Sequence, residues 1–293
     1  MLKAIKQHVG FGCVHLSMMP TLQSALSLLE TAYENGITYF DTAPIYGSGY
    51  SEKIVGKFIK NKRQHITVTT KFGLLPHIQR NIPPWIALPI KHLKKKHQTE
   101  NQSESGNIIP DVLPFRRIEC KEIKTAFQKS LVNLKTDYID NYLLHEALPD
   151  FLSDEAMNYI FDLKKKGLVR KIGIAASYVN LYQLAPEKIT NWDILQYENG
   201  LLFTSDDILQ IFPGKKHIYH SILKKLKTIK IDGYSKNEIA GILLARALKN
   251  NPAGQVLFST SKNENIKEDL KNLEKFQQLS LNDLNNTIVD AIY

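Results

Sequence analysis

The sequence lacks several patterns that define other classes of protein. It has only two cysteines, Cys13 and Cys120, whose spacing fits neither a disulfide framework nor a set of metal ligands. No stretch reaches the about 18 apolar residues that a membrane span needs. The start, MLKAIKQHVGFG, has no apolar signal-peptide core. These absences predict a protein of the reducing cytoplasm, with no metal centre and no membrane partner.

The sequence has more positively than negatively charged residues. Lys and Arg number 38 against 29 Asp and Glu, which gives a formal net charge of +9. The basic residues form no arginine-rich tract, and no zinc finger, helix-turn-helix or RNP-like aromatic signature accompanies them, so we expect no nucleic-acid partner. The charge forms either a plain solvated surface or a field that draws in anionic small molecules such as dinucleotides.

Strand-type and helix-type segments alternate along the 293 residues. This alternation predicts parallel strands joined by right-handed crossovers, and eight such units close into a (β/α)8 TIM barrel, an α/β fold. We expect one domain over residues 1–293. The expected strands are 9–16, 37–40, 65–70, 138–144, 169–175, 192–197, 216–222 and 255–260. The expected helices are 21–36, 51–60, 118–133, 153–166, 180–186, 235–249 and, as the last, 263–278. The seventh strand is the weakest, and its flanks show no clear extra helix.

Residues 74–117 interrupt this rhythm after the third strand. The segment begins rich in proline and aromatic residues, continues with the basic run KHLKKKH and then has the polar run QTENQSESGN. A loop of this length inside a compact domain is usually functional or poorly packed. Because it leaves the barrel beside Lys71, we interpret it as a lid over the site, with a plain surface insertion as the alternative.

Four ionisable residues lie at or just after three of the expected strands. Asp41 and Tyr46 belong to FDTAPIYG, Lys71 to VTTKFG and His145 to YIDNYLLH. Parallel strands end at the same face of a barrel, so these side chains should gather there. Together they suit proton transfer to a carbonyl oxygen, because Lys71 lowers the pKa of Tyr46 and Asp41 holds Lys71 charged. His145 can orient the substrate, and a hydride-donating cofactor is the expected source of electrons.

At these residues the chain resembles the aldo-keto reductase family. The resemblance implies a barrel, an NAD(P)H cofactor and the reversible conversion of a carbonyl into an alcohol. By match of motifs, Tyr46 is the acid/base, Lys71 and Asp41 tune it, and His145 orients the carbonyl. The insertion gives a looser resemblance to the sugar (aldose) dehydrogenase branch, so the expected substrate is a small carbonyl compound or sugar. The matching motifs are, in chain order, GFG, FDTAxxYG, SE, the strand-end lysine, TDYIDxxLLH, LVRKIGI, DILQYE and SxxNIKEDL.

The resemblance also implies a cofactor site. Gln196 matches a contact to the nicotinamide amide, and Tyr219 matches the residue whose ring stacks on nicotinamide. The expected cofactor is NADP as NADPH, with NAD as the alternative. Residues 259–262 could otherwise be an ordinary polar turn. The matches to the phosphate and adenine contacts are Ser259, Thr260, Ser261, Lys262, Asn265, Glu268 and Asp269.

Three departures from the family pattern concern this cofactor site. Ala175 and Ala176 replace a Ser-Asn pair, so that only Ser177 stands beside the nicotinamide position. The sequence ILKKLK replaces the glycine-rich loop that clasps the pyrophosphate, and Asp269 replaces an asparagine.

Other functional interpretations remain beside the oxidoreductase. One is a non-catalytic nucleotide-binding barrel that acts as a sensor or binds a partner protein. Another is a phosphate-binding barrel enzyme without redox chemistry, which would leave Tyr46 and Lys71 without a role. A Rossmann fingerprint is excluded, because Glu52 occupies the position of its third glycine. The sequence leaves the oligomeric state and the individual substrate open.

Overall fold

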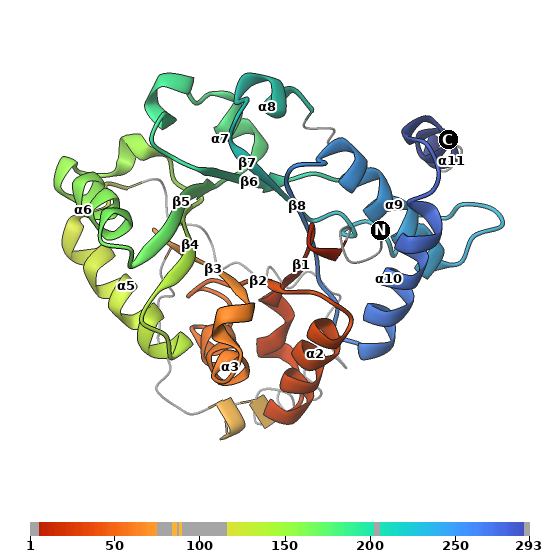
Figure 1. Ribbon diagram of the computed structural model, residues 1–293, viewed down its shortest axis with the longest axis horizontal. Helices are drawn as coiled ribbons and strands as arrows, with labels where there is room; N and C mark the ends of the chain where they lie inside the picture. The colour runs from red at the N-terminus through yellow and green to blue at the C-terminus, as the bar shows by residue number, and fades with distance from the viewer. Residues whose placement is uncertain (1–5, 75–83, 87, 90–115, 202–205, 290–293) are drawn as a thin grey trace, which may run out of the picture.

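A computed structural model describes residues 6–74, 84–86, 88–89, 116–201 and 206–289. Its centre is a closed barrel of eight parallel strands in the order in which they occur in the chain, so the predicted (β/α)8 fold is confirmed. Figure 1 shows the helices as a ring around these strands. The strands are β1 (Val9–Gly12), β2 (Tyr39–Asp41), β3 (Thr67–Phe72), β4 (Ile139–His145), β5 (Val169–Ala175), β6 (Ile194–Glu198), β7 (Lys216–His220) and β8 (Gln255–Phe258).

Helices follow the strands and return the chain to the other end of the barrel. Several begin with side-chain caps, as in the reciprocal capping boxes of Thr21 with Ser24 and of Ser235 with Glu238. The α-helices are α2 (Leu22–Glu34), α3 (Tyr50–Ile59), α5 (Cys120–Leu134), α6 (Asp154–Lys165), α7 (Tyr178–Tyr182), α8 (Asp206–Ile211), α9 (Lys236–Asn250), α10 (Asn263–Phe276) and α11 (Leu281–Val289). The 3-10 helices are η1 (Cys13–Met18), η2 (Arg63–His65), η3 (Pro149–Phe151) and η4 (Pro186–Ile189).

The structure corrects two sequence-based boundaries and adds two helices. The short helix expected over 180–186 is α7 (Tyr178–Tyr182), and η4 (Pro186–Ile189) follows it. The first strand ends at Gly12, because the chain then turns into η1 and buries Cys13 and Leu16 three residues apart, a helical spacing. The short helix α8 was missed before β7. Helix α11 was missed after α10, although Leu284 and Ile288 are buried at the i, i+4 spacing of a helix face.

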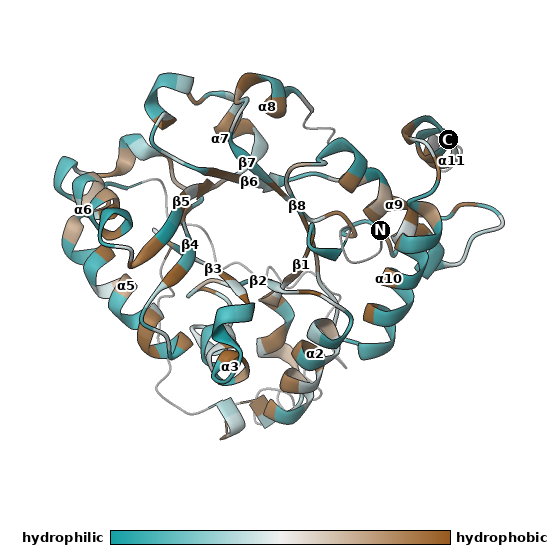
Figure 2. Cartoon of the chain, viewed as in Figure 1, coloured by the Kyte–Doolittle hydropathy of each residue, from teal (hydrophilic) through white to brown (hydrophobic). Residues whose placement is uncertain are grey.

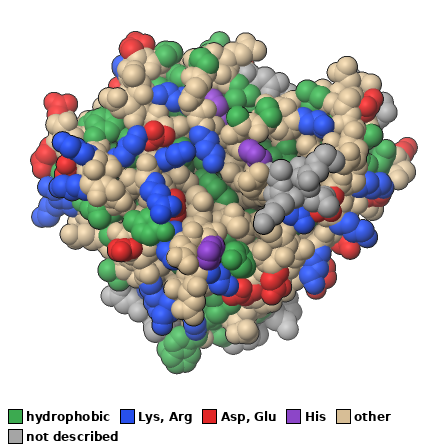
Figure 3. Space-filling model, viewed as in Figure 1, with side chains coloured by type: hydrophobic (Ala, Val, Ile, Leu, Met, Phe, Trp, Pro, Cys, Tyr) green, Lys and Arg blue, Asp and Glu red, His purple; other side chains and the backbone are tan. Residues whose placement is uncertain are grey.

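The predicted lid, residues 74–117, lies almost wholly outside the described residues, so its role stays a prediction. Within the described ranges, no helix combines the length and the apolar character that a membrane crossing requires. Figure 3 shows Lys and Arg side chains on the face turned to the viewer, with Asp and Glu side chains among them.

Two apolar clusters fill the molecule, and they separate the two faces of each strand. The larger one lies between the strands and the helices, and the smaller one fills the barrel interior with Tyr39, Leu143, Ala175, Ile194, Ile218 and Leu257. Figure 2 shows hydrophilic residues along the outer sides of helices such as α10. Because successive side chains of a strand point to opposite faces, membership of a cluster tells which residues face the barrel interior.

Gly56 marks a point where two outer helices approach closely. A Cβ atom at this position of α3 would overlap the backbone of Asn133 and Leu134 at the end of α5. Contact with backbone atoms cannot be relieved by rotating a side chain. A residue without a Cβ atom is therefore required here by the packing of α3 on α5.

We predict that Gly56→Ala lowers the free energy of unfolding by about 1–3 kcal/mol, the usual range for overpacking. The sign is informative, because alanine normally stabilises a helix interior by about 1 kcal/mol relative to glycine. Urea denaturation measures the change, with Lys57→Ala at the exposed next position as the control. A Gly56→Ala protein at least as stable as the parent would show that α3 and α5 do not touch in this way.

Candidate active site

The four predicted catalytic residues lie together where the strands end. Asp41 is the last residue of β2, Lys71 the fifth of the six in β3, and His145 the last of β4. Tyr46 follows in the turn after β2 and reaches back over these strand ends. Strand register brings the three strands side by side, with Asp41 opposite Thr69 and Lys71 opposite Leu143. The C-terminal end of a parallel barrel is where such folds hold their active sites.

A buried ion pair joins two of these residues. Lys71 Nζ lies 2.6 Å from Asp41 Oδ1, and the two side chains are only 2% and 4% exposed. The ammonium group also donates to the carbonyl oxygen of Thr42 at 3.1 Å. Burial on its own lowers the pKa of Lys71, but Asp41 and then Tyr46 outweigh it, and the pKa is raised. Lys71 therefore stays a cation at neutral pH.

The phenol of Tyr46 is the third partner of this cation. Lys71 Nζ donates to the phenol oxygen at 3.4 Å and lies 5.0 Å from the ring centroid. Burial raises the pKa of Tyr46 and Lys71 counteracts it, with a net rise. The phenol is thus protonated at neutral pH. If it gave up its proton, the cation of Lys71 would lie beside the phenolate.

His145 stands edge-on to Tyr46. The two ring centroids are 6.2 Å apart at an interplanar angle of 86°. Burial, followed by Lys71 and His220, lowers the pKa of His145 well below its usual range, so the imidazole is neutral. Its Nδ1 atom is buried and has no hydrogen-bond partner among the described residues. A neutral imidazole can donate one hydrogen bond to a carbonyl oxygen without competing with Tyr46 for protonation.

Gln196 connects the tetrad to β6. Its Nε2 atom donates to Asp41 Oδ2 at 3.0 Å, so both carboxylate oxygens of Asp41 are engaged. Its Oε1 atom is buried and finds no hydrogen-bond partner in the described part of the chain. An open acceptor at this depth suits an amide N–H group of a ligand. This orphaned oxygen fits the predicted contact to a nicotinamide amide.

The prediction for Tyr219 needs a correction, because the structure places its ring on the face of β7 that points away from the barrel interior. Tyr219 is fully buried in the cluster between strands and helices, and its ring packs at 5.3 Å against that of Tyr197. Its neighbour Ile218 belongs to the interior cluster, so His220 is the next residue of β7 to face inward. The prediction that Tyr219 stacks on nicotinamide is therefore wrong, and it missed His220.

The charge on Lys71 affects the pKa of His220, and His220 affects the pKa of His145. Burial, then Lys71 and Lys224, lowers the pKa of His220 to about 3, and His220 in turn acts on His145. Its Nδ1 atom lies 2.9 Å from Ser221 Oγ. The alternation of Lys216, Ile218 and His220 along β7 was the signal in the sequence that could have identified it.

The residues at and just after the end of β5 contribute to the core and to the start of α7. Ala175 and Ala176 are buried, and Ser177 is the N-cap of α7, where its hydroxyl accepts from the N–H of Asn180 at 3.4 Å. The hydroxyl of Ser177 therefore has a structural partner of its own. Its contact with a cofactor stays a prediction.

The predicted phosphate turn is held by one threonine. Thr260 Oγ1 accepts from the backbone N–H of Lys262 and from Asn265 Nδ2, each at 3.2 Å. Lys262 is the N-cap residue of α10, and its exposed side chain has no ion-pair partner among the described residues. Backbone N–H groups at a helix N-terminus and a neighbouring lysine form a suitable environment for a phosphate group. Ser259 and Ser261 belong to the same turn.

The predicted adenine contacts differ in exposure. Glu268 is exposed on α10, whereas Asp269 is only 3% exposed. Burial, reinforced by Glu268, raises the pKa of Asp269 to about 7. The carboxyl group that replaces the family's asparagine is therefore close to half-protonated at neutral pH.

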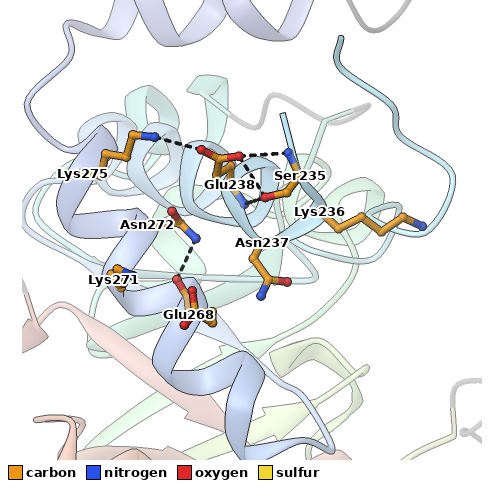
Figure 4. A pocket seen from close by; sticks show the side chains of 8 residues that line it. All are labelled: Ser235, Lys236, Asn237, Glu238, Glu268, Lys271, Asn272 and Lys275. Atoms are coloured by element: carbon orange, nitrogen blue, oxygen red, sulfur yellow. Dashed lines mark hydrogen bonds and ion pairs between the residues drawn. The ribbon is translucent and has the colours of Figure 1, made fainter. Parts of the chain in front are cut away.

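A depression between α9 and α10 lies in the outer layer rather than at the strand ends. Figure 4 shows one ion pair among its lining residues, the 2.8 Å contact between Lys275 and Glu238. Ser235 caps α9 through Glu238, and Asn272 donates to the carbonyl oxygen of Glu268. The ion pair between Lys275 and Glu238 joins α10 to α9, whereas the other two interactions lie within one helix each. In the described part of the chain, no three His, Cys, Asp or Glu side chains are grouped as metal ligands.

Comparison with known proteins shows the family to which the chain belongs. The Aldo/keto reductase family model matches residues 8–286, and the chain belongs to that family. The oxidoreductase YqkF of Bacillus subtilis is 34% identical over 173 residues, covering 59% of this chain and 46% of the relative. The NADH-specific methylglyoxal reductase of Escherichia coli is 29% identical over 157 residues, covering 52% and 41%. The chain thus spans about half the length of such curated relatives, or less.

Solved structures show the same fold. The aldo-keto reductase AKR11C1 from Bacillus halodurans, in its holo form, superposes with a TM-score of 0.67 at 21% identity, covering 98% of this chain and 93% of that one. At this level of identity the likeness concerns the fold alone.

We predict that Asp269→Asn stabilises the protein at pH 8 and does so clearly less at pH 5. A carboxyl whose folded pKa is raised to about 7 contributes stability at low pH, and this is lost as pH rises from about 4 through 7. Asparagine cannot ionise, so the variant should gain about 3 °C or more in Tm at pH 8. The control is Glu264→Gln, an exposed position of α10. An equal change in Tm at both pH values would contradict this account.

Proposed function

We propose that this protein is an NAD(P)-dependent oxidoreductase that reversibly transfers hydride between a nicotinamide cofactor and the carbon of a carbonyl or alcohol group. The observation that carries the proposal is the buried Lys71–Asp41 ion pair at 2.6 Å, with the phenol of Tyr46 at 3.4 Å from the same ammonium. Family membership supports it. The substrate class is an aldehyde, a ketone or a sugar.

The residues divide the work of protonating a carbonyl oxygen. In the direction of reduction, Tyr46 donates its proton to the oxygen as negative charge develops there. Lys71 stabilises the phenolate that remains, and Asp41 keeps Lys71 charged and in place. Neutral His145 donates a hydrogen bond to the same oxygen and fixes the orientation of the carbonyl. In oxidation the proton returns to the phenolate by the same path.

We expect several residues around the strand ends to contact the cofactor. When bound, NAD(P)H supplies the hydride that the side chains cannot. The open Oε1 of Gln196 would accept from the nicotinamide amide, and His220 presents a ring from β7. The turn of Thr260 and the N-terminus of α10 would hold phosphate, with Lys262 as the cation for a 2′-phosphate. NADPH is therefore the proposed cofactor, and NADH is the alternative, since one relative is NADH-specific.

A second candidate function is a non-catalytic barrel that binds the nucleotide and acts as a sensor. The observation in its favour is the pair of buried alanines at 175 and 176 where the family holds the nicotinamide amide. A substrate panel separates the two functions. Quenching or enhancement of NADPH fluorescence without turnover of any aldehyde or sugar would favour the sensor.

We predict that Tyr46→Phe lowers turnover at least about 100-fold, the scale of a lost general acid. NADPH binding should stay nearly unchanged, because the phenol oxygen is the group removed and the ring remains. Steady-state reduction of an aldehyde, followed by the absorbance of NADPH, measures the first effect, and fluorescence titration measures the second.

The control for this variant is Tyr234→Phe, which removes a hydroxyl from a partly exposed tyrosine in the segment before α9. It should leave turnover within about twofold of the parent, as surface substitutions usually have little effect. Turnover of Tyr46→Phe within about threefold of the parent would remove Tyr46 from the role of acid.

We predict that Lys262→Ala weakens NADPH binding about tenfold while NADH binding changes little, because only NADPH carries the 2′-phosphate that the ammonium would meet. Paired titrations with the two cofactors measure the ratio. Lys267→Ala, at an exposed site on the same helix, controls for the loss of a positive charge. Equal losses for both cofactors would place Lys262 away from the 2′-phosphate.

A further inference from the structure

The ammonium group of Lys71 uses all three of its hydrogens. It donates to Asp41 Oδ1 at 2.6 Å, to the carbonyl oxygen of Thr42 at 3.1 Å and to the phenol oxygen of Tyr46 at 3.4 Å. An ammonium carries three N–H groups in a tetrahedral arrangement, so two acceptors fix the direction of the third N–H. The position of the Thr42 carbonyl therefore helps to decide whether the remaining N–H points at the phenol.

Two buried hydroxyls hold Thr42 in place. Ser51 Oγ donates to the carbonyl oxygen of Cys13 at 2.9 Å, and it lies 2.7 Å from Thr42 Oγ1. A hydroxyl has a single hydrogen, which Ser51 gives to Cys13, so the Thr42 hydroxyl is the donor in the contact between the two side chains. Thr42, Ser51 and Cys13 are fully buried, so solvent water does not compete for these hydrogen bonds.

Ser51 also holds the segment that carries Tyr46. The backbone N–H of Ser51, in the first turn of α3, donates to the carbonyl oxygen of Tyr46 at 3.3 Å. The side chain of Ser51 is thus bonded to the residue that presents the second acceptor of Lys71, and its backbone to the residue that presents the third. Removal of the hydroxyl would release Thr42 and leave the bond to Tyr46 in place.

We propose that Ser51 is a positioning residue which, through Thr42, directs an N–H group of Lys71 at the phenol of Tyr46. The proposal rests on the proposed function, since that phenol is the proposed proton donor. Ser51 acts only through the hydroxyl of Thr42 and touches neither Lys71 nor the phenol oxygen in the hydrogen bonds above.

The simpler role for Ser51 is structural. Its bond to Cys13 joins α3 to the start of η1, and such a link stabilises the fold without any effect on Lys71. The two roles differ in what they change. A structural link affects the melting temperature, whereas a positioning residue also affects the pH at which the phenol loses its proton.

The direction of that pH effect follows from the charge of Lys71. The cation lowers the pKa of Tyr46 against the effect of burial, which raises it. An ammonium that no longer points at the phenol lowers this pKa less, so the pKa of Tyr46 rises. The alkaline limb of the pH profile for aldehyde reduction should then move to higher pH, because the phenol keeps its proton for longer.

The test compares the pH dependence of kcat/KM for reduction of an aldehyde by NADPH in the parent and in Ser51→Ala. We expect the maximal kcat/KM of Ser51→Ala to fall about tenfold, mainly through kcat, which is the scale of one lost hydrogen bond. Its alkaline limb should move to higher pH, in the same direction as that of Lys71→Met. NADPH binding, measured by fluorescence titration, should change little.

The matched control is Ser153→Ala, the same substitution at another buried serine. Its hydroxyl accepts from the backbone N–H of Ala156 at 3.2 Å and caps α6, away from Lys71. This variant should lose thermal stability, as helices do without their cap, and should keep the pH profile of the parent.

A second pair of variants changes the other end of the same hydrogen bond and serves if Ser51→Ala does not fold. Thr42→Val removes the hydroxyl with little change in shape, and it should shift the profile as Ser51→Ala does. Thr42→Ser keeps a hydroxyl at this position, so its profile should lie closer to that of the parent than the profile of Thr42→Val does.

A double-mutant cycle separates positioning from a general loss of structure. In the Lys71→Met protein, Ser51→Ala should change kcat/KM less than about twofold, because the group that Ser51 directs is no longer present. A structural link would lower kcat/KM by the same factor in both backgrounds.

A pH profile of Ser51→Ala that keeps the position of the parent's profile would overturn the proposal and leave Ser51 as a link between α3 and η1. A loss of kcat/KM that recurs unchanged in the Lys71→Met protein would overturn it as well. Failure of the parent to reduce any carbonyl compound in a substrate panel is a different result. It would overturn the proposed function itself, and the positioning role with it.

Discussion

The buried ion pair between Lys71 and Asp41 is the interaction on which the rest of the site depends. A charged lysine that is 2% exposed is tolerated only when a carboxylate faces it and hydrogen bonds satisfy the remaining groups. Asp41 meets both needs, since Gln196 holds its second oxygen at 3.0 Å. The pair therefore ties β2, β3 and β6 to one point at the end of the barrel. Because it fixes a cation under the phenol of Tyr46, it also sets what chemistry that phenol can do.

Two imidazoles complete the mouth without disturbing that cation. His145 on β4 and His220 on β7 both have lowered pKa values, because they are buried and face Lys71. They remain neutral at neutral pH, which is consistent with Tyr46 as the proposed proton donor. Strained turns at Glu146 and Ser221 follow these two histidines directly. The strand ends thus carry the ionisable groups of the site, and turns of fixed backbone conformation follow them.

The sequence was sufficient for the barrel and for the placing of Asp41, Tyr46, Lys71 and His145 at one end, because strand–helix alternation and motifs next to strands depend on local pattern. Tyr219 shows where such reasoning fails. A shift of one residue in a strand moves a side chain to the other face, and the motif alone did not fix that register. The positive φ of Glu146 was not predicted for another reason, since such a conformation at a non-glycine residue leaves no mark in the sequence.

The pH dependence of kcat/KM for aldehyde reduction by Lys71→Met, compared with the parent, tests the central claim most directly. The neighbouring cation lowers the pKa of Tyr46, so its removal should raise that pKa. The account predicts that the alkaline limb of the profile moves to higher pH and that the maximal rate falls. A profile that keeps its position, with turnover equal to that of the parent, would contradict the account and show that Lys71 does not tune Tyr46.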